Sequence, residues 1–222
     1  MRLIDLTHAI HEDMPVYPGT EKPKLPIGCT LQEHGFLERK LTMFSHTGTH
    51  MDAPAHLIEG GAYLDGLPIT QFFGKAVLID VAGWAGRRIM TADLLEHASR
   101  IAVAEFVILR TGWSRYWGAD AYFEGFPVLD PGAAQWLAAG GLKGVGVDAI
   151  SVDPTDSTGY EVHKALLGNG MVIIENLTNL EALPADGFHV SCFPLAIRDA
   201  DGSPVRAVAH VGLGCPAALP QE

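Results

Sequence analysis

The amino-acid sequence predicts an α/β fold in which one mixed sheet is packed with helices. Two observations support this prediction. From residue 76 onward, apolar segments of strand length alternate with segments that carry helix start and stop signals, which is typical of an α/β layer. At both ends of the chain, strand-like segments follow one another without a helix between them, which favours antiparallel pairing. The length of 222 residues fits one large domain or two small ones. Because no internal repeat or long linker divides the chain, we expect a single domain over residues 1–222.

The first quarter of the chain is expected to hold two strands separated by an irregular arm. Residues 2–10 are rich in aliphatic side chains and are interpreted as the first strand. Four prolines interrupt residues 11–28, so this segment is interpreted as a Pro-rich arm. Residues 38–45 alternate between polar and apolar side chains, which indicates a strand that leads into a histidine-rich stretch.

Helix signals and apolar strands alternate through the rest of the chain. Asp130 at the N-cap and Pro131 at the first helical position predict a helix that Gly140 and Gly141 end. Thr91 is expected to cap a helix over residues 92–100, and a short helix is expected over residues 160–167. The expected strands are residues 76–81, 105–110, 144–150, 171–177, 188–197 and 205–211, and the last two are expected to flank a hairpin turn at residues 199–204.

Composition limits the classes of partner and the compartment. The formal net charge of −11 argues against binding to nucleic acid or to anionic membranes. Cys29, Cys192 and Cys215 form neither a CxxC pair nor a disulfide framework, which favours a reducing compartment. Asp5 and His8 interrupt the apolar run that a signal peptide would need, and no apolar run approaches the ~20 residues that span a bilayer. We therefore expect a cytoplasmic protein.

Residues 46–56, His-Thr-Gly-Thr-His-Met-Asp-Ala-Pro-Ala-His, are the most informative segment of the chain. His50 and Asp52 are two positions apart, so on an extended strand they point to the same side. His46 would lie roughly 13 Å from His50 on a straight strand, but Gly48 permits a tight turn that closes this gap. Imidazole nitrogens and a carboxylate oxygen that converge in this way suit a divalent metal ion. The alternative is a loop with satisfied polar residues and no metal.

Three further residues are candidates for the same site. His56 follows Pro54, which turns the chain away from Asp52, so His56 is either a fourth ligand or a proton shuttle beside the ligands. Glu175 lies in the apolar run 171–177, where a carboxylate is costly unless it is paired or binds metal. His163 lies in the expected short helix and is the weaker candidate, because histidines on helices are usually solvated.

One other segment has two interpretations. The aromatic segment 110–125 is either a wall or lid of a substrate site or a packed surface loop. Asp153 follows an apolar strand and is expected to cap a turn.

The segment from His46 to His56 resembles the HxGTHxDxPxH signature of the cyclase-like metal-dependent hydrolases, the family of bacterial kynurenine formamidase (arylformamidase) and isatin hydrolase. The similarity extends over most of the chain. Residues 4–7 (Ile-Asp-Leu-Thr) resemble the opening strand of the family, and residues 14–19 (Met-Pro-Val-Tyr-Pro-Gly) resemble its Pro-rich arm. Residues 151–154 (Ser-Val-Asp-Pro), with the later His163 and Glu175, fall where the family has its second set of ligands.

The resemblance implies a fold, a metal centre and an assembly. The fold would be a swivelling β/β/α domain with a mixed sheet. Asp52 and Glu175 would bridge two ions, zinc or alternatively manganese, and His56 would be the general acid/base. The chain would form a homodimer or homotetramer in which the arm reaches a neighbour's site. The full set of metal ligands would be His46, His50, Asp52, His163 and Glu175.

The resemblance also implies a reaction. A metal-activated hydroxide would cleave an amide, with N-formylkynurenine as the first expectation for the substrate. Tyr17 is aligned with a tryptophan that lines the substrate pocket of kynurenine formamidases, so at this position the chain departs from them. Two alternatives stay open: a ring-opening hydrolase of a lactam or lactone, similar to isatin hydrolase, and a metal-binding protein without catalytic activity.

Overall fold

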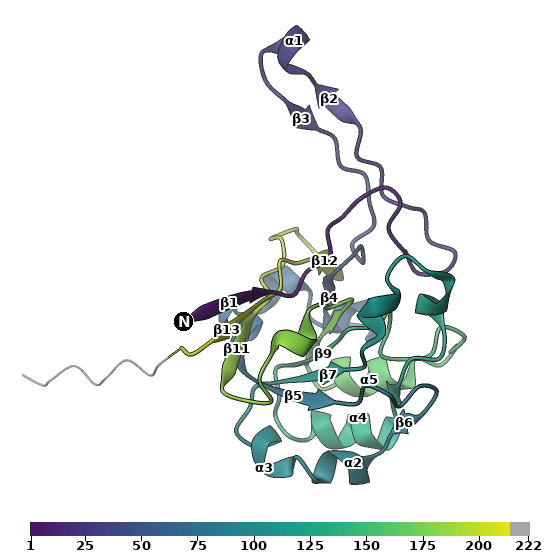
Figure 1. Ribbon diagram of the computed structural model, residues 1–222, viewed down its shortest axis with the longest axis vertical. Helices are drawn as coiled ribbons and strands as arrows, with labels where there is room; N and C mark the ends of the chain where they lie inside the picture. The colour runs from purple at the N-terminus through teal and green to yellow at the C-terminus, as the bar shows by residue number, and fades with distance from the viewer. Residues whose placement is uncertain (214–222) are drawn as a thin grey trace, which may run out of the picture.

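A nine-stranded mixed sheet organises the computed structural model, which describes residues 1–213; Cys215 lies outside these residues. The strand order is β1-β13-β11-β5-β7-β9-β10-β4-β12 (Figure 1). These strands are β1 (Arg2–Asp5), β4 (His50–Asp52), β5 (Phe73–Asp80), β7 (Phe106–Arg110), β9 (Gly144–Val147), β10 (Val172–Glu175), β11 (Phe188–Ser191), β12 (Gly202–Pro204) and β13 (Val208–Val211). The predicted α/β fold with a mixed sheet is confirmed.

The centre of the sheet is parallel, as the alternation of strands and helices predicts. Strands β5, β7, β9 and β10 pair in parallel. Their residues are apolar almost without interruption, because both faces of the sheet are covered. The side chains of β7 alternate between two cores: Val107 and Leu109 pack on the side of helices α4 and α5, and Ile108 packs on the opposite side with Met51 and Ile174.

Short helices cover the α4 side of the sheet (Figure 1). Helix α4 begins as predicted, with the Asp130 carboxylate accepting a hydrogen bond from the Gly132 amide. The helix expected over residues 92–100 is wrong in detail: it is two short helices, and its N-cap is Met90 instead of Thr91, because the Asp93 carboxylate accepts the Met90 amide hydrogen. The α-helices of the body are α2 (Thr91–Leu95), α3 (Ala98–Ile101), α4 (Pro131–Ala138) and α5 (Glu161–Leu167). Six 3-10 helices are Pro54–His56, Leu64–Gly66, Ile69–Phe72, Trp113–Tyr116, Asp120–Phe123 and Leu180–Ala182 among the described residues.

The segment after β1 links the antiparallel strands at one end of the sheet to the segment that follows β10. Antiparallel pairs form both ends, β1–β13–β11–β5 on one side and β10–β4–β12 on the other. Beyond β1, Thr7 bridges Leu177 and the Leu6 amide donates to the Ala207 carbonyl. This arrangement gathers residues from the start, middle and end of the chain around β4 and β10.

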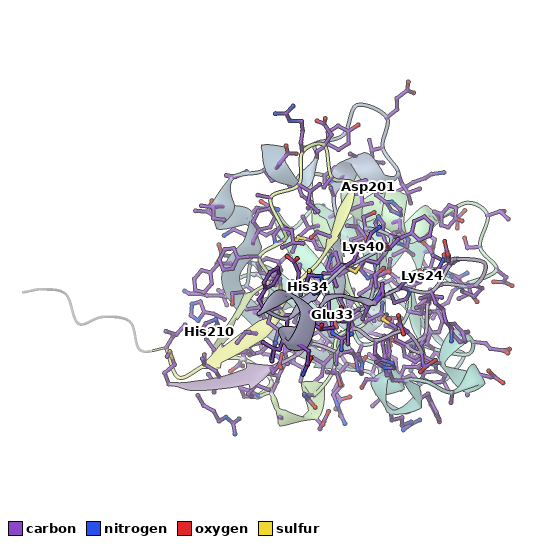
Figure 2. All side chains as sticks on the ribbon, turned by 90° about the horizontal axis from the view of Figure 1, so that it is seen from above. Lys24, Glu33, His34, Lys40, Asp201 and His210 are labelled. Carbon is purple, nitrogen blue, oxygen red and sulfur yellow. The ribbon has the colours of Figure 1, made fainter. Side chains whose placement is uncertain are left out.

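The expected strand at residues 38–45 is wrong. Only β3 (Glu38–Arg39) forms there, and it pairs with β2 (Ile27–Cys29) in a hairpin that rises from the body, with α1 (Leu31–His34) at its tip (Figure 1). Glu33 and His34 mark this tip in the view from above (Figure 2). The alternation in residues 38–45 therefore did not indicate a half-buried strand, since most of these side chains are exposed.

The expected hairpin turn at residues 199–204 is also wrong. Strands β11 and β13 do pair antiparallel, as predicted. The segment between them does not simply turn, because residues Gly202–Pro204 form β12 and pair with β4 at the far edge of the sheet. Hydrogen bonds from the Ala53 amide to the Asp201 carbonyl and from the Val205 amide to the Thr49 carbonyl hold this excursion in place.

A two-stranded parallel sheet joins β6 (Arg88–Ile89) to β8 (Val128–Leu129). Within residues 1–213, no helix combines the length and the apolar character that crossing a bilayer requires. The cytoplasmic location stays a prediction.

Candidate metal centre

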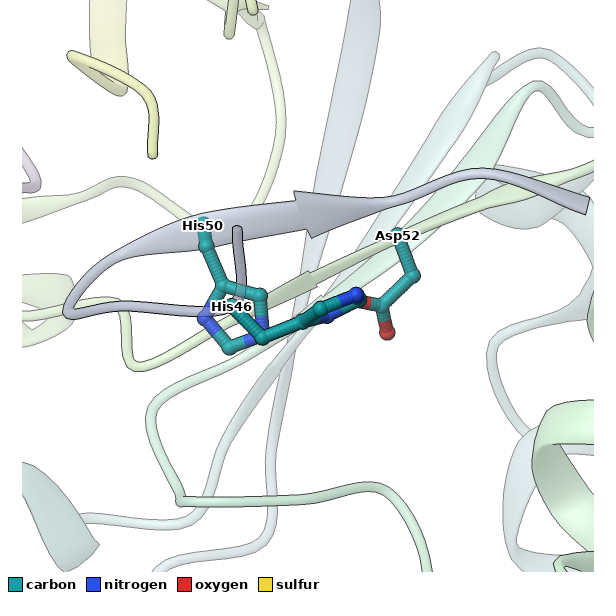
Figure 3. A group of neighbouring side chains, drawn as sticks. All are labelled: His46, His50 and Asp52. Carbon is teal, nitrogen blue, oxygen red and sulfur yellow. The ribbon is translucent and has the colours of Figure 1, made fainter. Parts of the chain in front are cut away.

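A turn at Gly48 brings His46 back towards the strand that carries His50 and Asp52. Gly48 has φ +66°, a conformation that glycine adopts at little cost, so the chain reverses just before β4. Figure 3 shows His50 and Asp52 on the same side of β4, with the His46 ring reaching towards the Asp52 carboxylate. The distances from Asp52 Oδ1 are 2.7 Å to His46 Nδ1 and 3.3 Å to His50 Nε2. The convergence expected from the motif is present.

Strand β10 and helix α5 add a second carboxylate and a third imidazole. Glu175 is the register partner of His50, and its Oε2 lies 3.4 Å from His50 Nε2. His163 on α5 directs its Nε2 to within 3.3 Å of Glu175 Oε1 and 3.7 Å of Asp52 Oδ2. The five residues expected to bind metal therefore lie together, although α5 and β10 are more than 100 residues from the motif in sequence.

Each of the three imidazoles has one nitrogen directed at the carboxylates and the other at an outer partner. His50 Nδ1 lies 2.8 Å from the Gly48 carbonyl, and His163 Nδ1 lies 2.7 Å from Asp153 Oδ2. His46 Nε2 lies 3.0 Å from Asp201 Oδ2. A histidine whose outer nitrogen donates a hydrogen bond presents a lone pair at the inner one, which is the usual arrangement of metal-ligating histidines.

The inner groups are buried and strongly charged. Burial opposes the charge on His50, but hydrogen bonds to Asp52 and Glu175 raise its pKa to about 10. For His163 the same opposition by burial is overcome by Asp153 and Glu175, which raise its pKa to about 10. Despite the opposing effect of burial, His46 and His50 hold the pKa of Asp52 well below its usual range. Two buried carboxylates thus require positive charge, supplied by protonated imidazoles or by a cation that displaces those protons.

The donor set fits a divalent metal ion. Asp52 Oδ2 is buried and has no hydrogen-bond partner within the described part of the chain, as expected for an oxygen reserved for a cation. Nitrogen and carboxylate donors of this kind suit zinc or manganese. Three overlapping groups each have ligand atoms within 4.8 Å of one another: His46, His50 and Asp52; Asp52, His163 and Glu175; and His46, His56 and Asp201.

His56 lies beside the carboxylate pair. It ends the 3-10 helix that follows β4, is half-buried, and its ring centroid lies 4.0 Å from that of His46 and 6.3 Å from that of His163. Its Nδ1 lies 3.4 Å from Asp201 Oδ2. Burial lowers the pKa of His56, whereas the pKa values of His46, His50 and His163 are raised. His56 therefore lies at the edge of the cluster, and its assignment as a proton shuttle stays a prediction.

The Tyr17 side chain lies close to the segment that carries Asp153, within the same chain. Its hydroxyl donates to the Thr155 carbonyl at 3.1 Å, two residues beyond Asp153. A hollow of about 320 Å³ lies between residues 13–22 and 118–123, and both Tyr17 and Phe123 line it. None of the proposed metal ligands lines this hollow, so the role of Tyr17 as a wall of the substrate site stays a prediction.

The aromatic segment 110–125 is mainly packed structure. Trp113 and Tyr122 are buried in the core. The Tyr122 hydroxyl donates to Asn176 Oδ1 at 2.7 Å, and Asn176 Nδ2 donates to the Gly48 carbonyl at 2.9 Å. This chain of hydrogen bonds supports the turn that carries His46 and His50.

The sequence did not single out two of the supporting residues, Asp201 and Asn176, and for Asp153 it indicated only a cap. Asp201 was assigned to a hairpin turn, and no local signal separated it from an ordinary turn aspartate. Asn176 follows Glu175 directly but carried no pattern of its own. Asp153 does cap α5, through the amides of Val162 and His163, and the same carboxylate also holds the His163 ring.

Comparison with known proteins gives a consistent result. The Cyclase family model matches residues 4–154. Kynurenine formamidase of Bacillus cereus is 33% identical over 208 residues, which cover 92% of this chain and 95% of that protein. Isatin hydrolase A from Labrenzia aggregata, solved with benzyl benzoate, superposes with a TM-score of 0.84 at 27% identity over 95% of this chain and 93% of the other. A structure described as a predicted metal-dependent hydrolase from Bacillus stearothermophilus superposes with a TM-score of 0.75 at 31% identity. The match covers 94% of this chain and 97% of the other.

The curled mixed sheet is the fold of isatin hydrolase, and the similarity to kynurenine formamidases and to metal-dependent hydrolases defines the chain as a metal-dependent hydrolase. The match over residues 4–154 and the identity to kynurenine formamidases show that the chain belongs to the cyclase family.

Proposed function

We propose that this enzyme hydrolyses the amide bond of an N-formyl arylamine, with N-formylkynurenine as the first candidate substrate. The observation that carries the proposal is the convergence of three imidazoles on Asp52 and Glu175, with the imidazole of His56 beside them. The likeness to kynurenine formamidases over 92% of the chain supports the choice of substrate.

The proposed cofactor is two zinc ions per chain, with manganese as the alternative. His46, His50, Asp52, His163 and Glu175 would hold them, and Asp52 and Glu175 would bridge. A bound divalent cation lowers the pKa of water from ~16 towards ~7 and polarises a carbonyl group. The outer partners of His46, His50 and His163 fix these rings so that little reorganisation accompanies binding.

The protein contributes proton transfer and a pocket wall. When water adds to the amide it gives up a proton, and when the tetrahedral adduct collapses the departing nitrogen needs one. We assign both transfers to His56, which would take the proton from the attacking water and pass it to the nitrogen. His56 suits this role because it lies beside the buried donors with its Nδ1 directed to Asp201. Tyr17 would supply an aromatic wall for the aryl group of the substrate, because its hydroxyl donates to the Thr155 carbonyl, two residues from Asp153.

A ring-opening hydrolase of a lactam or lactone is the second candidate. The similarity to isatin hydrolase A supports it. So does Tyr17, which departs from the tryptophan expected of a kynurenine formamidase. A metal-binding protein without activity is disfavoured, because metal binding by the five proposed ligands does not require His56.

We also propose that the chain works as a homodimer or homotetramer. The β2–β3 hairpin and the segments at its base expose large apolar side chains far from the core. These are Ile27, Leu31, Phe36, Leu37, Leu41 and Phe44. An apolar projection of this kind is stabilised when a second copy covers it. Light scattering of the purified protein tests the assembly, and a monomeric mass would contradict it.

Turnover of N-formylkynurenine and of the lactam isatin by the same zinc-loaded sample separates the candidates. We expect a clearly higher kcat/KM for N-formylkynurenine. Preference for isatin would replace the formamidase proposal with the ring-opening one. Full zinc loading without turnover of amides, lactams or lactones would leave only the metal-binding alternative.

A further inference from the structure

One carboxylate, Asp201, contacts two of the four histidines. Its Oδ2 lies 3.0 Å from His46 Nε2 and 3.4 Å from His56 Nδ1, while its Oδ1 accepts a hydrogen bond from the Ser45 hydroxyl at 3.0 Å. Asp201 is itself half-exposed and belongs to a segment 145 residues after His56. The Ser45 contact leaves Oδ2 directed at the two rings.

The backbone around Asp201 is built for this contact. Its carbonyl accepts the Ala53 amide hydrogen, and the next residue begins β12 alongside β4. Gly202 lies directly against the His46 ring, because a Cβ at this position would come within 2.5 Å of His46 Nε2. A glycine is therefore required for the ring to occupy the place where it meets both Asp52 and Asp201.

A hydrogen-bonded carboxylate determines which nitrogen of an imidazole carries the proton. If Asp201 accepts from His46 Nε2, the Nδ1 lone pair of His46 faces Asp52 and the metal. If it accepts from His56 Nδ1, the Nε2 of His56 is left to exchange a proton with the substrate. Both consequences follow from one oxygen atom.

We propose that Asp201 is a positioning residue that sets the tautomer of His46 for metal binding and the tautomer of His56 for proton transfer. The part that concerns His56 rests on the proposed hydrolytic function. Metal binding by His46 and proton transfer by His56 are then coupled, because the single side chain of Asp201 fixes both rings.

Asp201→Asn tests the inference in the zinc-loaded enzyme, with Asp199→Asn as the matched control. Asp199 is an exposed residue of the same segment, and the control changes charge equally. We expect Asp201→Asn to weaken zinc binding by about 10–100-fold. At saturating zinc, kcat should fall by a similar factor while KM changes little, and Asp201→Glu should recover part of the loss. In ¹⁵N NMR spectra of the zinc enzyme, His56 should lose the Nδ1–H tautomer that the wild type shows.

An Asp201→Asn protein that matches Asp199→Asn in zinc affinity, kcat and the His56 tautomer would overturn the inference. So would a loss confined to one of the two histidines. If Asp201→Asn does not fold, Ser45→Ala replaces it, because it frees Oδ1 alone; a smaller change in the same three readouts is expected, and no change would overturn the inference. If the wild type hydrolyses none of the substrates, the proposed function fails, while zinc affinity and NMR still decide the role of Asp201.

Discussion

Replacing His56 with alanine is expected to lower kcat by about 10²–10⁴-fold and to leave the metal content unchanged. The reason is the position of His56: it contacts Asp201 and its ring lies beside that of His46, but it makes no ion pair with Asp52 or Glu175. Removing it takes away the proton donor for the leaving nitrogen and leaves the five proposed ligands in place.

The measurement is kcat on N-formylkynurenine together with zinc per chain by elemental analysis of the same sample. His97→Ala is the matched control, because His97 is also half-buried but bonds to Arg100, away from the site. Loss of zinc from the His56→Ala protein would make His56 a ligand and end its assignment as acid/base.

Glu175→Gln is expected to weaken zinc binding by more than about 100-fold, since even the outer partners of ligands contribute about 10–100-fold. The carboxylate is buried between His50 and His163 and bonds to both rings. An amide of the same shape removes one of the two negative charges that attract the cation. Activity should fall with occupancy and return in part at high zinc concentration.

Zinc titration of chelated Glu175→Gln and wild-type proteins measures this effect directly. Glu161→Gln is the control, because Glu161 is exposed on α5, two residues before His163. Unchanged zinc affinity and stoichiometry in the Glu175→Gln protein would remove Glu175 from the ligand set.

Local patterns predicted the parts of the fold that depend on neighbours in sequence. Parallel strands and helix α4 followed from apolar runs and from the Asp130–Pro131 start signal. Two segments were wrong because long-range pairing decides them. Residues 38–45 have the alternation of a strand, yet only Glu38 and Arg39 form one, in a hairpin that projects from the body. Residues 202–204 read as a turn, yet they pair with β4, about 150 residues earlier.

The same distinction holds for the site. His46, His50 and Asp52 could be grouped from sequence because one glycine turn brings them together within seven residues. His163 and Glu175 were weaker candidates, and their place beside the motif rested on the family resemblance. Asp201 could not be predicted, because only the pairing of β12 with β4 brings it to His46 and His56.

We expect the hydrolase activity of this chain to depend on metal held by His46, His50, Asp52, His163 and Glu175. The most direct test removes metal with a chelator and restores zinc stepwise while N-formylkynurenine turnover is followed. We predict no turnover in the chelated protein and full recovery at about two zinc ions per chain, the number that a two-metal mechanism requires. Turnover that survives complete removal of metal would contradict the dependence of activity on metal.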